Sequence, residues 1–119
     1  MTKQNNALKE RLSQSSELTI TVTGRKSGRP ISIPIWFALE GDTLYLLPVH
    51  GSDSQWYKNV LADPKIRIDA GGARTETTIT PLTNHQEVES VVNKFRSKYG
   101  AGDVKKYYSK LDTAVVVHL

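Results

Sequence analysis

The sequence feature that most constrains the fold is a run of strict alternation over residues 17–23. Apolar Leu18, Ile20 and Val22 alternate with three threonines, which makes a period of two built largely from β-branched residues. Such a run has one buried face and one polar face, and it predicts a β-strand. The chain contains no cysteine, so its stability must come from packing and not from disulfides.

Five further runs have β-strand character and are separated by turns that contain glycine or proline. They cover residues 31–39, 43–49, 65–70, 74–82 and 113–119. Pro34 lies inside the first of these runs, and because proline cannot donate to a ladder it predicts an edge, a bulge or a bend. The meander-like order of six strands favours an antiparallel barrel or a strongly curled sheet, which protects strand edges better than an open sheet does.

Helical spacing of apolar residues recurs between the strands. It predicts an N-terminal helical extension within residues 1–16, a helix over residues 55–62, a longer helix capped by Asn84 that ends near Gly100, and a short helix over residues 102–111. At 119 residues the chain falls in the usual size range of one domain. We therefore expect a single domain over residues 1–119, mainly β with α+β character, in which three or four helices surround about six strands.

Charge and composition exclude several classes of protein. No apolar stretch approaches the ~20 residues of a membrane helix, and the polar N-terminus lacks the apolar core of a signal peptide. We therefore expect a cytoplasmic protein without stable membrane insertion. The three histidines have no metal-ligand spacing, so no metal site is expected. The formal net charge of +4 favours anionic partners without choosing among them.

The strongest local signal is a basic loop, Gly-Arg-Lys-Ser-Gly-Arg over residues 24–29, at the end of the first strand. Glycines let the backbone approach an anion, while arginine, lysine and serine offer hydrogen-bond donors to a phosphate. The candidate binding residues are Arg25, Lys26, Ser27 and Gly28. A solvated hairpin tip is the alternative interpretation.

A second cluster lies where a polar loop enters the helix over residues 55–62, because the free N–H groups of a helix start favour anions. The candidates in and after this loop are His50, Gly51, Ser52, Trp56 and Asn59. Trp56 alternatively anchors the helix in the core, and Asn59 alternatively faces solvent.

Tyrosines near the third and fourth helices are candidate proton donors. Tyr99 and Tyr107 are the candidate catalytic residues. Half-buried packing with a hydrated hydroxyl is the alternative role for each of them.

Residues 18–37 and 56–65 together resemble the deazaflavin-dependent nitroreductase family. The resemblance rests on Gly-Arg-Lys-Ser-Gly followed by Trp-Tyr-x-Asn-Val-x-Ala-x-Pro, and the two motifs in this order are more specific than either alone. It implies a split antiparallel β-barrel whose cleft holds the deazaflavin coenzyme F420. The phosphate and acidic tail are then expected near Arg25, Lys26 and Ser27, and the ring near Pro34, Trp36 and the helix that carries Trp56.

The resemblance implies hydride transfer from the reduced cofactor to an electron-poor small molecule of nitroaromatic, quinone or enone type. Ile31 and His50 stand where the family often has basic residues. FMN is therefore the alternative cofactor, and a non-catalytic barrel that carries a cofactor or a lipid is an alternative function. A single-stranded nucleic-acid-binding barrel is less favoured, because Glu76, Glu87 and Glu89 interrupt the basic pattern. A homodimer is left open.

Overall fold

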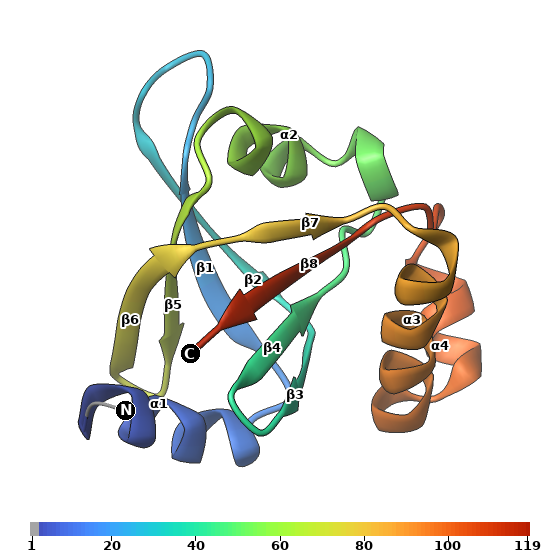
Figure 1. Cartoon of the computed structure of the whole chain (residues 1–119), viewed down its shortest axis with the longest axis horizontal. Coiled ribbons are helices and arrows are strands. Elements are labelled where there is room, and N and C mark those ends of the chain that lie inside the picture. The colour runs from blue at the N-terminus through green and yellow to red at the C-terminus, as the bar shows by residue number, and fades with distance from the viewer. Residues whose placement is uncertain (1–2) are drawn as a thin grey trace.

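The computed structural model describes residues 3–119 (Figure 1). Over these residues the chain forms four α-helices, one 3₁₀ turn at Gly51–Asp53 and eight β-strands. The helices are α1 (Lys3–Ser13), α2 (Gln55–Ala62), α3 (His85–Tyr99) and α4 (Ala101–Tyr107). The strands are β1 (Leu18–Thr23), β2 (Pro30–Ile35), β3 (Phe37–Glu40), β4 (Thr43–Leu46), β5 (Lys65–Ala70), β6 (Ala73–Thr78), β7 (Thr80–Leu82) and β8 (Ala114–His118). Residues 1 and 2 of the expected N-terminal helix lie outside the described residues.

The strands form two antiparallel sheets of four strands each. The first sheet has the order β2-β1-β5-β6, and the second has the order β3-β4-β8-β7. The chain passes from the first sheet to the second at two bends. At one bend β2 continues into β3 across Trp36, and at the other β6 continues into β7 across Ile79. Bends of this kind make the corners of orthogonally packed sheets.

These two bends explain why six strands were expected and eight are found in the described residues. The expected strands over residues 31–39 and 74–82 are each divided at a corner. The expected α+β fold class is therefore confirmed, with four helices around the strands. The term split barrel is approximate, because the described ladders form two sheets and not one closed barrel.

The alternation in β1 matches its burial, since Leu18, Ile20 and Val22 are buried while the threonines between them are partly exposed. Ile20 lies opposite Ile33 of β2 on one side and Ile68 of β5 on the other. All three isoleucines therefore share the inner face. Pro34 lies in β2, which is an edge strand, so the expectation drawn from its missing N–H is confirmed.

Two expected elements end earlier than the sequence pattern suggests. The strand expected over residues 43–49 ends at Leu46, because Pro48 has no N–H for the ladder and its carbonyl already accepts a bond from Gly51 N. The helix expected over residues 102–111 spans Ala101–Tyr107, and Ser109 N instead donates to Val49 O. This bond holds the chain after α4 beside the chain after β4.

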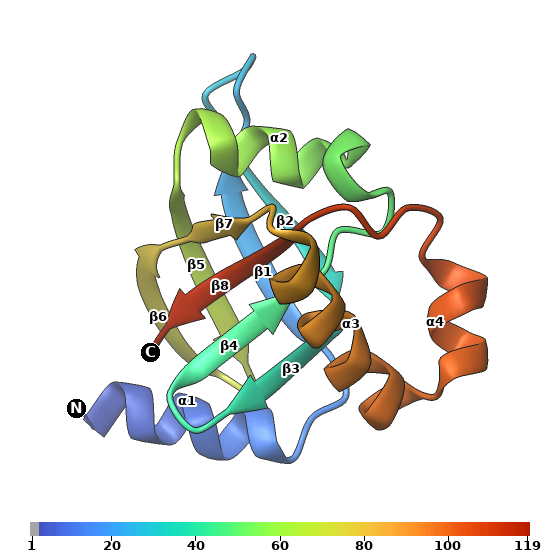
Figure 2. The same cartoon turned by 45° about the vertical axis from the view of Figure 1, so that its right-hand side comes forward.

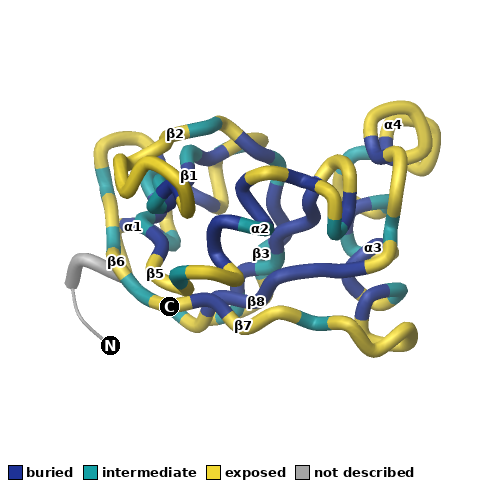
Figure 3. The backbone as a smooth tube through the Cα atoms, turned by 90° about the horizontal axis from the view of Figure 1, so that it is seen from above, coloured by how far each residue is buried: buried dark blue, intermediate teal, exposed yellow. Residues whose placement is uncertain are grey.

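The apolar core has two parts. One lies between the sheets, where α1 packs against β5 and β6 and contributes the fully buried Leu8 and Leu12. The other lies where α3 and α4 cover the second sheet around Phe95. Figure 3 shows buried backbone through the middle of the molecule and an exposed β1–β2 loop. Each fully buried leucine contributes about 1.5–3 kcal/mol.

The expected cap of α3 is confirmed, because the Asn84 side chain accepts hydrogen bonds from Gln86 N and Glu87 N. Such a cap contributes about 1 kcal/mol to a helix. Within residues 3–119, none of the helices has the length and apolar character needed to cross a bilayer.

Candidate functional site

The basic loop between β1 and β2 is closed by its own backbone. Gly24 N donates to Arg29 O at 2.8 Å, and Gly28 N donates to Gly24 O at 2.8 Å. Gly28 has a φ of 71°, a left-handed conformation that glycine adopts without the strain a side chain would cause. The loop is thus a defined turn and not a loose hairpin tip.

Arg25 fastens this loop to helix α2. Its guanidinium donates to Asn59 Oδ1 at 2.7 Å and to Gln55 Oε1 at 2.8 Å, and its backbone N–H donates to Asn59 Oδ1 at 3.1 Å. Asn59 is buried, with only 5% of its surface exposed. Arg25 therefore joins the basic loop to the helix of the second motif. The guanidinium N–H groups that make these bonds donate to α2 and not to a ligand.

The other cations of the loop remain available. Lys26 and Arg29 are exposed, and within residues 3–119 neither side chain makes a hydrogen bond or an ion pair. Ser27 Oγ accepts a bond from Arg29 N at 3.2 Å, so this hydroxyl is used inside the loop. An anion at the loop would meet Lys26 and Arg29 first.

Beside the loop, β2 and α2 enclose a cavity of about 280 Å³, which we call the β2–α2 cavity. Its walls combine the inner face of β2 with the first residues of α2. They include the predicted site residues Pro34, His50, Trp56 and Asn59, together with Ile31, Ile33, Ile35, Val49, Ser54 and Gln55.

A neighbouring cavity of about 330 Å³ lies between β2 and the end of α4, and we call it the β2–α4 cavity. Its lining comprises Glu17, Pro34, Ile35, Trp36, Leu47, Val49, Tyr107 and Tyr108. The two cavities share Pro34, Ile35 and Val49, so they adjoin each other along β2, and we call the pair the groove along β2. The β1–β2 loop and α2 lie at one end of β2, and α4 lies toward the other (Figure 2).

The groove leaves apolar surface uncovered. Three of the four large hydrophobic residues that are exposed in the described chain line it: Ile31 at 39%, Val49 at 38% and Tyr107 at 49%. A cluster of exposed apolar side chains marks a place where a ligand or a partner binds. The groove thus combines exposed apolar surface with a basic loop beside one of its ends.

The corner between β2 and β3 is held by Tyr99 of α3. The Tyr99 ring stacks on Trp36 with 4.1 Å between ring centroids, and its hydroxyl accepts a bond from Phe37 N at 3.0 Å. The hydroxyl also donates to backbone oxygen, with Ser16 O at 2.7 Å and Phe37 O at 2.9 Å. Burial raises the pKa of Tyr99, which keeps the phenol protonated. Tyr99 therefore fixes the corner, and it lines neither cavity.

Two other tyrosines do reach the groove. Tyr107 lies edge-on to Trp36, with 5.6 Å between ring centroids. Tyr108 is more deeply placed, and burial raises its pKa well above the usual range. The Tyr108 phenol is therefore neutral at neutral pH and can donate a hydrogen bond.

The loop before α2 faces two ways. His50 lines the β2–α2 cavity, and its Nδ1 lies 2.9 Å from Ser109 Oγ. Ser52 turns away from the cavity and donates to Asp112 from both its backbone N–H, at 2.9 Å, and its hydroxyl. Gly51 is buried against this contact with a φ of 55°, where a Cβ would collide with Asp112. Gly51 and Ser52 thus contact the loop that precedes β8 and hold it against the loop that precedes α2.

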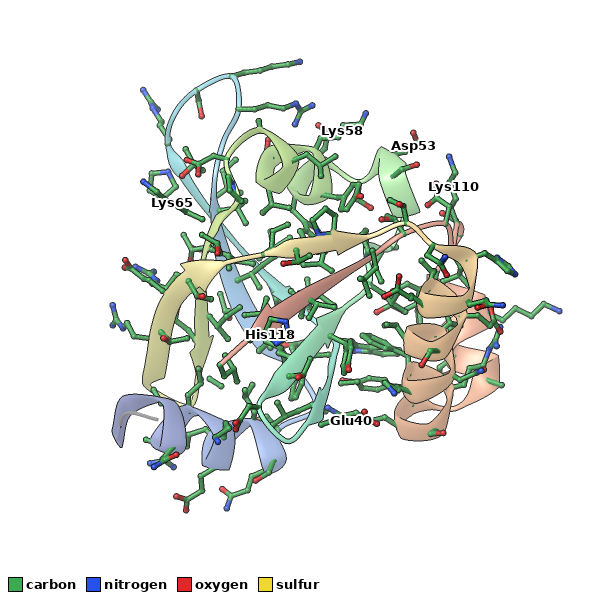
Figure 4. The ribbon with its side chains drawn as sticks, in the orientation of Figure 1. Glu40, Asp53, Lys58, Lys65, Lys110 and His118 are labelled. Atoms are coloured by element: carbon green, nitrogen blue, oxygen red, sulfur yellow. The ribbon has the colours of Figure 1, made fainter. Side chains whose placement is uncertain are left out.

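Charges surround this junction of two loops. Lys110 lies 3.2 Å from Asp53, and Figure 4 shows the two side chains beside each other. Burial acts to raise the pKa of Asp112, but the hydrogen bonds from Ser52 and the charge of Lys110 outweigh it and lower that pKa. These contacts anchor the loop before α2 to the loop before β8.

A larger cavity, of about 980 Å³, lies elsewhere, between the end of α1, β3 and α3. It contains none of the residues of the two motifs. Lys98 lines it and donates to Phe37 O at 3.0 Å, and burial lowers the pKa of Lys98 to about 8. We place the site in the groove along β2, because the motifs, the free cations and the exposed apolar side chains meet there.

Six of the thirteen residues expected from the sequence line the two cavities, namely Pro34, Trp36, His50, Trp56, Asn59 and Tyr107. Arg25, Lys26, Ser27 and Gly28 lie in the basic loop, and Gly51, Ser52 and Tyr99 line neither cavity. Sequence reasoning missed Gln55 and Glu17. The spacing of Gln55 and Asn59 by one helical turn was a signal for their shared role. Glu17 carried no local signal.

No group of three histidine, cysteine, aspartate or glutamate side chains that could hold a metal ion occurs in residues 3–119.

The chain was compared with known proteins. The family model described as F420H(2)-dependent quinone reductase matches residues 1–119. An F420H(2)-dependent quinone reductase of Mycobacterium tuberculosis (strain H37Rv) is 30% identical over 71 residues, which cover 57% of this chain and 48% of that protein. The chain thus spans about half the length of the curated relatives it matches.

Solved structures share the fold. An F420-H2 dependent reductase, FDR-A, has a TM-score of 0.68 at 21% identity and covers 87% of this chain and 94% of its own. A structure titled a domain-swapped dimer has a TM-score of 0.70 at 19% identity and covers 95% of this chain and 98% of its own. The family match extends over all 119 residues and confirms the resemblance seen in the two motifs, so the chain belongs to the F420H(2)-dependent quinone reductase family.

Proposed function

We propose that this chain binds reduced coenzyme F420 in the groove along β2 and reduces a quinone-type acceptor there. The observation that carries the proposal is the joining of two adjacent apolar cavities with a basic loop at one end. Family membership names the cofactor, and these described residues supply a place that fits it.

The β2–α2 cavity suits the flat ring system. Its walls are mainly aliphatic, with Trp56 as an aromatic surface and the polar atoms of His50, Ser54 and Gln55 at its border. Ligand sites typically combine such apolar walls with a few convergent polar groups. Lys26 and Arg29 then face the phosphate and the acidic tail through charge-assisted contacts. Arg25 acts indirectly, by holding the loop on α2.

The β2–α4 cavity suits the acceptor. Trp36, Tyr107 and Tyr108 provide aromatic surfaces for a planar molecule, and Tyr107 is exposed enough to donate a hydrogen bond to an acceptor oxygen. The bound cofactor supplies a hydride. The chain itself aligns two planar molecules along one groove and shields them from water, which is the main contribution of a protein to such a reaction.

Of the residues expected to be catalytic, we propose that Tyr107 contacts the acceptor and that Tyr99 is a positioning residue. The reason is geometric: the Tyr99 hydroxyl is occupied by the backbone of the corner, whereas Tyr107 lines the cavity.

FMN is the competing cofactor. Ile31 and His50 make the wall of the β2–α2 cavity less cationic, which reduces its attraction for a polyanionic tail. Purified protein titrated with oxidised F420 and, separately, with FMN distinguishes the two. We expect saturable binding of F420, and reduction of 1,4-naphthoquinone once reduced F420 is added. Binding of FMN alone would refute the proposal.

A homodimer in solution is a second proposal, supported by the similarity to a structure titled a domain-swapped dimer. Light scattering during size-exclusion chromatography tests it, since a mass of twice 13.3 kDa is expected. The expectations of a single domain, a cytoplasmic location and no nucleic-acid partner stay predictions.

A further inference from the structure

Glu17 is the one charged side chain that lines the β2–α4 cavity within the described residues. It lies in the linker between α1 and β1, directly before the buried Leu18. The other side chains of the cavity are aliphatic or aromatic. A carboxylate has thus been placed at the border of an otherwise uncharged pocket.

The carboxylate of Glu17 has no compensating partner. It is exposed, and over residues 3–119 it makes no hydrogen bond or ion pair. The nearby cation Lys98 is directed to Phe37 O, on the side of the larger cavity. Burial is the main reason for the raised pKa of Tyr99, and the negative charge of Glu17 adds to it. The field of Glu17 therefore reaches the Tyr99 phenol, which stacks on Trp36 of the cavity wall.

An uncompensated charge at the border of a pocket with apolar walls selects ligands by their charge. It attracts cations and repels anions, because the surrounding low-dielectric walls reduce screening by water. The effect is strongest for a ligand that lies within a few ångströms of the carboxylate and decreases with added salt.

We propose that Glu17 is a specificity-determining residue, which makes the β2–α4 cavity favour cationic and neutral quinone-type acceptors over anionic ones. This inference rests on the proposed function, since it takes that cavity as the acceptor site. In the reaction the acceptor gains a hydride from reduced F420 and a proton from solvent and becomes the hydroquinone, while F420 becomes oxidised. Glu17 changes which acceptors bind, and it takes no part in the bond changes.

The test compares three naphthoquinones that differ in charge: unsubstituted 1,4-naphthoquinone, a sulfonated one and one that carries a trimethylammonium group. Their affinities for the whole chain without cofactor are measured by quenching of tryptophan fluorescence, because Trp36 lines the cavity. The same three compounds are then used as acceptors with reduced F420. The binding experiment gives a readout that does not depend on turnover.

Glu17→Gln should lower the ratio of cationic to anionic affinity by about five-fold or more, as expected when one partly solvated unit charge is removed. Affinity for the neutral compound should change least. The matched control is Glu76→Gln, which removes the same charge on β6, at the opposite side of the molecule from α4 (Figure 1). This control should leave the ratio unchanged.

An equal ratio in the wild type and in Glu17→Gln would overturn the inference and leave the proposed function standing if 1,4-naphthoquinone is still reduced. Saturable quenching by none of the three compounds would overturn both. An increase of the wild-type ratio with added salt would also contradict an electrostatic origin.

Discussion

At the scale of single residues, the two neighbouring basic side chains of the loop have different tasks. Arg25 is bound by Gln55 and Asn59 of α2, whereas Lys26 is free to meet a ligand. Lys26→Ala should weaken F420 binding by about ten-fold, or roughly 1.4 kcal/mol, and leave the melting temperature unchanged, because only a ligand contact is lost. Fluorescence titration and thermal unfolding measure the two effects.

Arg25→Ala should weaken F420 binding and also lower the melting temperature. The substitution removes the guanidinium bond to the buried Asn59 Oδ1 and the one to Gln55 Oε1, and each lost hydrogen bond from a charged group costs about 1.5–3 kcal/mol. Lys65→Ala, which removes an exposed cation of β5, is the control for net charge. Equal melting temperatures for Arg25→Ala and the wild type would show that the Arg25 contacts do not stabilise the fold.

Asp112 should make stability depend on acid. Its pKa is lowered in the folded chain, so its contribution is present above the unfolded value near 3.8 and is lost as the pH falls through the folded value. The difference in unfolding free energy between the wild type and Asp112→Asn should therefore shrink as the pH falls below about 4. Urea unfolding at pH 3 and pH 6 measures it, and a difference that grows in acid would contradict the Ser52–Asp112 contact.

The residue types in the sequence could predict a cationic loop. They could not predict which of its cations contacts the protein and which is available to a ligand. Arg25 and Lys26 are adjacent and look equivalent, and only the approach of α2 separates their roles. Ser52 was a candidate because it lies in a polar loop before a helix start. Its partner Asp112 lies 60 residues away, a distance over which no local pattern reports contact.

At the scale of elements, the corner at Trp36 depends on helix α3. Tyr99→Phe should lower the unfolding free energy by about 1–3 kcal/mol, because Phe37 N–H loses its partner in a partly buried position. Tyr107→Phe should leave stability unchanged, because no hydrogen bond of its hydroxyl is found within residues 3–119. It should lower kcat with 1,4-naphthoquinone and change KM for that acceptor less, because Tyr107 lines the proposed acceptor cavity. Chemical denaturation of both variants measures the stabilising role of Tyr99. Steady-state kinetics of both variants measures the contact of Tyr107 with the acceptor. The reverse pattern would exchange the two assignments.

Most elements could be predicted because their signals are local. Alternation found β1, and the Asn84 cap found the start of α3. The corner at Ile79 could not be predicted, because β-branched residues run through it with no glycine or proline at the bend, and near Trp36 the one signal was Pro34, which left an edge, a bulge and a bend open. The bend is imposed by the second sheet, which is a tertiary effect that overrides local propensity.

At the scale of the whole molecule, the groove arises from the way two sheets share bent strands. β2 is the edge strand of the first sheet, and α2 and α4 leave part of the surface beside it uncovered. Ile31 of β2 and Val49, which follows β4, therefore remain exposed. The family resemblance predicted a cofactor cleft and the residues around it, but two adjoining cavities follow only from the placement of α2 and α4 toward opposite ends of one strand.

The central claim is that this groove is a deazaflavin site, and one side-by-side titration tests it most directly. Oxidised F420 and FMN are each added to the wild type and to Lys26→Ala, with binding followed by cofactor fluorescence. The account predicts saturable F420 binding that is tighter than FMN binding and is weakened by the substitution. Tighter binding of FMN, or F420 binding unaffected by loss of Lys26, would contradict it.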